Sequence, residues 1–85
     1  MIDKDLQFQI KNMNNRELCS LFTKACSNGE VEVVSYMLDD TEINNVLKKY
    51  YHDLGFKTAC NNGQVEIVKI MINDYDDLNI IKIQH

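Results

Sequence analysis

The 85-residue sequence contains no proline, no tryptophan and only three glycines. Two of these glycines, Gly29 and Gly63, stand where helices are expected to end, which leaves too few for a phosphate-binding loop. No apolar run approaches the ~20 residues that a membrane-spanning helix needs. The start of the chain, Met1 to Asp5, also lacks the basic residues and apolar run of a secretory signal. These absences argue against a nucleotide-binding enzyme, a membrane protein and a secreted protein.

Basic residues are also in the minority, because 13 acidic residues face 9 lysines and arginines and give a formal charge of −4. A general nucleic-acid-binding protein carries a basic face, so we expect no nucleic-acid partner. Apolar residues make up 45% of the chain, which is enough for one small folded domain.

What the sequence does contain is one ten-residue block that occurs twice. The first copy runs from Ala25 to Val34 as ACSNGEVEVV, and the second runs from Ala59 to Val68 as ACNNGQVEIV. The two copies are offset by 34 residues, and every pair of matched positions is identical or similar in kind. Internal similarity at a period of roughly 20–50 residues is typical of repeat architectures.

Apolar spacing predicts a helix before each glycine and a second helix after it. The first helix should begin near Asn14 and Asn15, with Asn15 as its N-cap, and the first helix of the second copy should be capped by Asp53. Each glycine can adopt the left-handed conformation that ends a helix. Asp39 and Asp40 should end the second helix of the first copy. The inner faces are expected to hold Leu18, Leu21, Phe22, Ala25, Cys26, Val31, Val33, Val34, Met37 and Leu38, and then Phe56, Ala59, Cys60, Val65, Ile67, Val68, Met71 and Ile72.

The segments around the two copies are less regular. Residues 1–14 fit both strand and helix spacing, and we interpret them as an N-terminal cap that is more helical than extended. The connector over residues 45–52 has helical apolar spacing and no glycine for a hairpin turn, so we predict a short helical turn and keep a β-hairpin as the alternative.

The sequence contains few cysteines, and their spacing does not suggest disulfide pairs. The three cysteines include no Cys-x-x-Cys, and Cys26 and Cys60 occupy the same position of the two copies. We therefore expect buried, reduced thiols in a cytosolic protein. His52 and His85 stand apart from other ligand residues, so no zinc site is predicted. Cys19 is the thiol expected to be partly exposed, which leaves a redox role as a third hypothesis.

The two copies resemble ankyrin repeats. The family pattern is a helix ending in Ala-Ala-x-x-Gly-His, a second helix rich in Val and Leu, and a turn ending in Val-Asn. The segments that match it are Ala25–Gly29 with Glu32–Leu38 and Ile43–Asn44, and Ala59–Gly63 with Glu66–Ile72 and Leu78–Asn79. The family's Thr-Pro-Leu-His is replaced by Ser20–Thr23 and Leu54–Lys57, a departure that is similar to the divergent arrays of large DNA viruses.

This resemblance implies an all-α fold, a short ankyrin-like array with two clear repeats and an N-terminal cap. The expected organisation of the single domain is a cap over 1–14, repeat 1 over 15–44, the connector over 45–52, repeat 2 over 53–79 and a C-terminal tail over 80–85.

The function that the resemblance implies is non-enzymatic protein–protein interaction in the cytoplasm, or in the host cytoplasm if the chain is viral. No cofactor is expected. Partner binding is assigned to the connector and to the concave face of the first helices. The alternative for the connector is that one tyrosine packs on the core, and the alternative for the first helices is that their polar residues are simply solvated. The residues assigned to this surface are Lys24, Ser27, Asn28, Tyr50, Tyr51, His52, Thr58, Asn61 and Asn62.

Two copies are few for a repeat stack, which usually needs at least about three units to bury a continuous core. The apolar tail suggests how the stack could be completed, because Ile80, Ile81 and Ile83 are unsuited to solvent. We assign these isoleucines to an oligomer interface, with a homodimer favoured and folding back onto the last helix as the alternative. A self-assembling structural protein without a separate partner is therefore the second function hypothesis. The acidic run Asp74-Tyr75-Asp76-Asp77 lacks the glycine and glutamate of a calcium loop and is expected to be a solvated helix end.

The small residues Ala25 and Ala59 should allow the paired helices of each copy to approach closely. Ala25→Leu or Ala59→Leu should therefore overpack this contact and lower the free energy of unfolding by roughly 1–3 kcal/mol. Urea unfolding measures the loss, and an unchanged midpoint for both variants would show that the two positions are not buried between helices.

Overall fold

The computed structural model describes residues 2–73, which form helices joined by short turns. The helices are α1 (Lys4–Lys11), α2 (Asn15–Asn28), α3 (Val31–Asp39), α4 (Thr41–Tyr50) and α5 (His52–Asn61), followed by a helix over residues 65–73. No strand occurs between residues 2 and 73, so the all-α prediction is confirmed for this part of the chain. None of these helices is long and apolar enough to cross a lipid bilayer.

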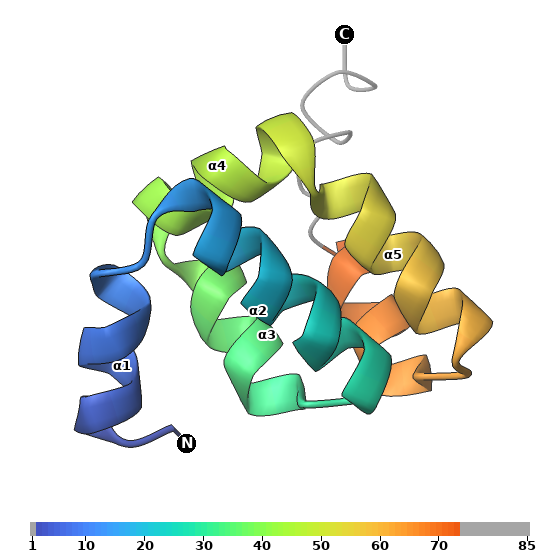
Figure 1. Cartoon of the computed structure of the whole chain (residues 1–85). Helices are drawn as coiled ribbons and strands as arrows, with labels where there is room; N and C mark the ends of the chain where they lie inside the picture. Colours follow the sequence, from blue (N-terminus) through green and yellow to red (C-terminus); the bar gives the residue numbers. More distant parts are fainter. Residues whose placement is uncertain (1, 74–85) are drawn as a thin grey trace, which may run out of the picture.

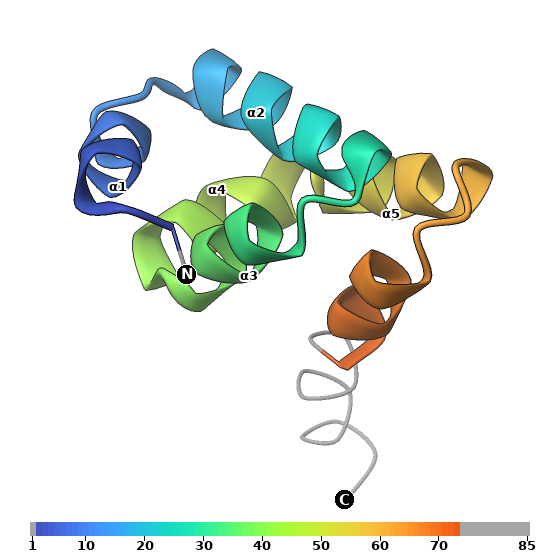
Figure 2. The same ribbon diagram turned by 90° about the horizontal axis from the view of Figure 1, so that it is seen from below.

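The helices are arranged around the pair formed by α2 and α5, which lie side by side (Figure 1). The helix α3 packs against α2, and α4 contacts α2, α3 and α5. The view from below shows α1 at one end of the molecule and the end of α5 at the other, with the helix over residues 65–73 beneath α5 (Figure 2). The connecting helix α4 thus spans the junction between the two copies of the repeated block.

Polar side chains fix where the first helices begin. Asn14, rather than Asn15, is the N-cap of α2, and its side chain accepts a 2.8 Å hydrogen bond from the Glu17 backbone N–H. The Glu17 carboxylate accepts in return from the Asn14 N–H at 3.0 Å, which completes a capping box. Asp3 caps α1 in a similar way by accepting from the Leu6 N–H. This confirms that the N-terminal cap is helical.

Both copies of the block turn at their glycine with the same hydrogen bonds. Gly29 and Gly63 have φ angles of 75° and 67°, in the left-handed region. The backbone N–H after each glycine donates to the alanine carbonyl five residues earlier, at 2.9 Å from Glu30 to Ala25 and at 2.9 Å from Gln64 to Ala59. This is the bond of a Schellman motif, which satisfies carbonyls at the helix end. The predicted helix–glycine–helix structure is therefore confirmed in both copies.

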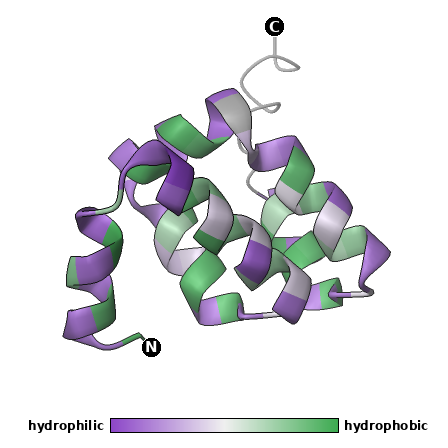
Figure 3. Ribbon diagram, in the orientation of Figure 1, coloured by the Kyte–Doolittle hydropathy of each residue, from purple (hydrophilic) through white to green (hydrophobic). Residues whose placement is uncertain are grey.

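The core lies where the inner faces of these helices meet, and along α2 hydrophilic and hydrophobic residues alternate as expected of an amphipathic helix (Figure 3). Met37 and Met71, at matching positions, are fully buried, as are Ala25 and Ala59. The buried apolar residues are Ile10, Leu18, Phe22, Ala25, Cys26, Val33, Val34, Met37, Leu38, Ile43, Leu47, Ala59, Ile67 and Met71.

The connector is helical, as predicted, but its helix is longer than a single turn. Asp40 follows directly after α3 and its carboxylate accepts from the Ile43 N–H at 3.1 Å, so α4 begins at Thr41. Ile43 and Asn44 were expected in a closing turn of the first copy, and this is wrong because both are buried within α4. Their burial follows from the contacts of α4 with α3 and α5.

Two other expectations for the second copy are corrected. Asp53 does not cap α5, because only Tyr51 separates α4 from α5 and the helix already begins at His52. Cys60 was expected to be buried like Cys26, yet its side chain is exposed. Cys26 is covered by α5, whose Gly55 lies close to the Cys26 sulfur, whereas Cys60 lies on an exposed part of α5.

One side chain ties the two copies together. The Gln64 amide donates a 2.9 Å hydrogen bond from Nε2 to the Ser27 carbonyl oxygen at the end of α2, across 37 residues of sequence. The same amide lies over Gly29, so a Cβ atom at Gly29 would collide with Gln64 Oε1. Gly29 is therefore required for its backbone conformation and for the space that Gln64 occupies.

The two glycines provide a matched test of this tie. Gly29→Ala and Gly63→Ala should each lower the free energy of unfolding by roughly 1–2 kcal/mol, because an alanine is strained in the left-handed conformation. Gly29→Ala should lose a further ~1 kcal/mol, because the new methyl group displaces the Gln64 amide and its hydrogen bond, whereas nothing lies within 4 Å of a Cβ at Gly63. Urea unfolding of both variants measures the difference, and equal losses would mean that Gln64 contributes little.

Candidate protein-interaction face

The outer sides of α2 and α5 carry most of the residues assigned to partner binding. Because the copies are related by 34 residues and the two helices lie side by side, matched positions share one side of the molecule. We call this surface the first-helix face. It consists of Lys24, Ser27 and Asn28 on α2, and Leu54, Thr58, Asn61 and Asn62 on or directly after α5.

The predicted polar residues of this face differ in what they can offer to a ligand. Lys24, Asn28 and Asn61 are exposed, and within residues 2–73 no hydrogen bond or ion pair holds their side chains. The Asn62 amide is engaged, since Nδ2 donates to the Thr58 carbonyl at 2.8 Å. The Ser27 carbonyl is occupied by Gln64. Three of the predicted side chains are thus available for new hydrogen bonds.

His52 does not belong to this surface, and its assignment to partner binding is wrong. It lies at the start of α5, only 4% exposed, with its ring centroid 6.5 Å from that of Phe22. The close approach of α4, α5 and α2 places this position inside the molecule. Tyr51 is half-buried between α4 and α5, and Tyr50 is the last residue of α4. Tyr51 and His52 therefore contribute less exposed surface than the sequence suggested.

Leu54 is the residue of this face that the sequence analysis missed. Its side chain is 49% exposed on α5, one helical turn before Thr58 and two turns before Asn61. The signal was available in the alignment of the copies, because Leu54 matches the polar Ser20 rather than a core position. Leu54 therefore adds one large, half-exposed apolar side chain to a surface that is otherwise polar.

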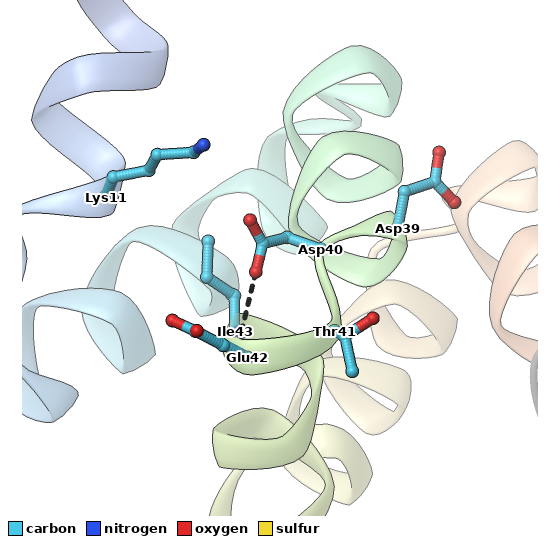
Figure 4. A pocket seen from close by; sticks show the side chains of 6 residues that line it. All are labelled: Lys11, Asp39, Asp40, Thr41, Glu42 and Ile43. Carbon is cyan, nitrogen blue, oxygen red and sulfur yellow. Dashed lines mark hydrogen bonds between the residues drawn. The ribbon is translucent and has the colours of Figure 1, made fainter.

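A polar hollow of about 450 Å³ lies elsewhere, between the end of α1 and the junction of α3 and α4. It is lined by Lys11, Asp39, Asp40, Thr41, Glu42 and Ile43 (Figure 4). The close-up shows the Asp40 carboxylate turned toward the Ile43 backbone and Asp39 directed away from it. Asp40 thus acts as a helix cap, and no group of three ligand side chains suited to a metal ion occurs in residues 2–73.

The three thiols differ strongly in environment. Cys26 is fully buried between α2 and α5, and burial raises the pKa of its thiol from 9.0 to about 12. Cys19 is half-buried, as expected for a partly exposed thiol, but Cys60 is the more exposed of the two. None of the three forms a disulfide.

The remaining assignments fall outside the residues that the structure describes. These are the oligomer interface at Ile80, Ile81 and Ile83, the acidic run 74–77 and the second closing pair, Leu78 and Asn79. They stay predictions from the sequence.

Comparison of the chain with models of protein families, with curated proteins and with solved structures finds no match in any of the three.

The thiols give a direct check of this geometry. At about pH 8 a thiol reagent should react quickly with Cys60, more slowly with Cys19, and with Cys26 only after unfolding, because the thiolate is the reactive form. Reaction of single-cysteine variants with a chromogenic disulfide measures the three rates. Fast reaction of Cys26 in the folded chain would contradict the packing of α5 on α2.

The burial of the Cys26 thiol should also make the folded chain less stable at alkaline pH. The folded state favours the neutral Cys26 thiol, so its contribution to stability is complete below pH 9.0 and is lost as the pH rises toward about 12. Cys26→Ala should remove this part of the pH dependence.

Proposed function

We propose that this chain is a non-enzymatic protein–protein interaction module that binds a partner protein through the first-helix face. The observation that carries the proposal is Leu54, an exposed leucine beside exposed polar groups on two adjacent helices. Its burial by a partner would remove apolar surface from water, which is the main favourable term in protein association.

The composition around Leu54 supports a specific contact. Protein interfaces combine apolar anchors with a polar rim, and the rim supplies directional hydrogen bonds. Asn28 and Asn61 can each donate and accept, and Lys24 adds one positive charge. A partner that suits this face would present a leucine-sized apolar recess next to amide or carboxylate groups.

The ankyrin-like character of the chain belongs to this proposal. It is supported by the two equivalent helix–glycine–helix units and by the adjacent packing of their first helices. In that family the first helices and the connectors bind partners, and here a helical connector shifts the surface toward α2 and α5. Free thiols in all three cysteines agree with the reducing cytoplasm, which in a viral setting would be that of the host.

Leu54→Asp tests the proposal directly. Because Leu54 is exposed, the substitution should change the free energy of unfolding by no more than ~0.5 kcal/mol. It should nevertheless weaken capture of the partner by at least about tenfold, or ~1.4 kcal/mol. Affinity capture from the native cell with quantitative mass spectrometry measures the effect, and Asn61→Ala should weaken capture to a smaller extent.

Phe8→Asp is the matched control, because Phe8 is another exposed apolar residue, at 71%, but lies on α1. This variant should retain the partner. Retention of the partner by Leu54→Asp, together with loss of the partner by Phe8→Asp, would place binding on α1 and contradict the proposal. A solution mass of two or more chains with no captured partner would favour the rival proposal, a self-assembling protein joined through Ile80, Ile81 and Ile83.

A further inference from the structure

Both glycine turns carry an asparagine directly before the glycine. The pairs are Asn28 with Gly29 at the end of α2, and Asn62 with Gly63 at the end of α5. Asparagine is one of the chemically labile residues of proteins. A glycine after it hinders attack on the asparagine side chain least, because glycine has no Cβ atom. Each turn therefore holds a candidate site of spontaneous deamidation.

Deamidation at such a pair is a substitution at the asparagine Cγ atom. A base in the solvent removes the proton of the glycine N–H, and the glycine nitrogen attacks Cγ. The new N–Cγ bond closes a succinimide ring while the Cγ–Nδ2 bond breaks, and the side-chain nitrogen takes up one proton and leaves as ammonia. Water then hydrolyses one of the two ring carbonyl–nitrogen bonds, so the product is aspartate or isoaspartate.

Ring closure requires the peptide plane after the asparagine to turn, because a helical backbone holds the glycine nitrogen away from Cγ. Asn62 has a ψ angle of 6°, and Asn28 is the last residue of α2. Both residues must therefore leave their present backbone conformation before they can react. The resistance of each turn to this movement decides which asparagine reacts faster.

The turn at Gly29 is covered by the other half of the chain. The Gln64 amide lies so close to Gly29 that a Cβ atom there would collide with Oε1, and Nε2 is held by the 2.9 Å hydrogen bond to the Ser27 carbonyl. Gly29 is half-buried. A rotation that brings the Gly29 nitrogen to the Asn28 side chain must displace this amide, so the first turn resists the reaction.

The turn at Gly63 has no such cover. Within residues 2–73, no atom beyond the adjoining residues lies within 4 Å of a Cβ at Gly63, and this glycine is exposed. Its N–H donates one 3.2 Å hydrogen bond, to the Cys60 carbonyl. The Asn62 amide must release the Thr58 carbonyl before it reacts, but that hydrogen bond is exposed and water can replace it. The second turn therefore resists the reaction less.

We propose that the bond between Asn62 and Gly63 is a site of spontaneous deamidation in the folded chain, and that the Gln64 amide protects the equivalent bond after Asn28. This modification site goes beyond the proposed function, and neither inference depends on the other.

The product differs from Asn62 in charge and in hydrogen bonding. A carboxylate at this position adds a negative charge at the end of α5, where the helix dipole disfavours it. It also lacks the Nδ2 donor that bonds the Thr58 carbonyl. The isoaspartate product inserts one further carbon into the main chain of the second turn. The chain would thus alter the second-copy end of its own first-helix face with age.

Tryptic mapping with mass spectrometry tests the proposal, because Asn28 falls in the fragment 25–48 and Asn62 in the fragment 58–69. The folded chain is kept at mildly alkaline pH, and aspartate and isoaspartate are measured at each site. Asn62 should react at least about fivefold faster than Asn28, the factor that corresponds to one hydrogen bond. In urea the two rates should be similar, because the local sequences SNGE and NNGQ are alike.

Gln64→Ala tests the protecting role of the amide. It should raise the rate at Asn28 by about fivefold, because the cover and its hydrogen bond are lost, and should change the rate at Asn62 much less. Ile43→Val is the control, since it trims a buried residue of α4 far from both turns and lowers stability mildly. This variant should leave the ratio of the two rates unchanged.

Three results would overturn the proposal. The first is a rate at Asn28 that equals or exceeds the rate at Asn62 in the folded chain. The second is an equal acceleration of Asn28 by Gln64→Ala and Ile43→Val, because global opening and not the Gln64 amide would then control the reaction. The third is an intact Asn62 in the folded chain after a period that converts the urea-unfolded chain completely.

Discussion

The contact between Gly55 and the Phe22 side of α2 is the constraint on which the rest of this structure depends. It allows α5 to approach α2 so closely that Phe22 and Cys26 are completely excluded from water. Only Tyr51 lies between α4 and α5, and His52, the first residue of α5, is buried beside the Phe22 ring. Packing at Gly55 thus brings the two halves of the chain into contact, together with α4 and the Gln64 hydrogen bond.

The short chain compensates for its small core by sharing residues between elements. Asp40 ends α3 and its carboxylate caps α4, so the corner between these helices needs no loop. Fewer loop residues reduce the conformational entropy that folding must overcome. The helix α4 then contributes Ile43 and Leu47 to the core, where a hairpin finger would have contributed little buried surface.

Local features of the fold could be predicted from the sequence because local rules govern them. The duplicated block revealed both glycine turns, and the apolar period identified the faces that hold Phe22, Met37 and Met71. Features that depend on neighbouring copies could not be predicted in this way. Cys26 and Cys60 have the same local sequence, and only the position of α5 makes one buried and the other exposed. His52 was misjudged for the same reason, since its burial beside Phe22 depends on the contact of α5 with α2.

Gln64 has a consequence for the way in which the molecule opens. Its amide holds the end of α2 from the other half of the chain, through Ser27 and above Gly29. Loss of order around Gln64 therefore removes a hydrogen bond from the first turn as well as from the second. The two turns are thermodynamically linked in the manner of nearest neighbours in a one-dimensional lattice, where each unit lends stability to the one before it. Opening of the second turn consequently lowers the stability of the first turn by the hydrogen bond that Gln64 donates to Ser27.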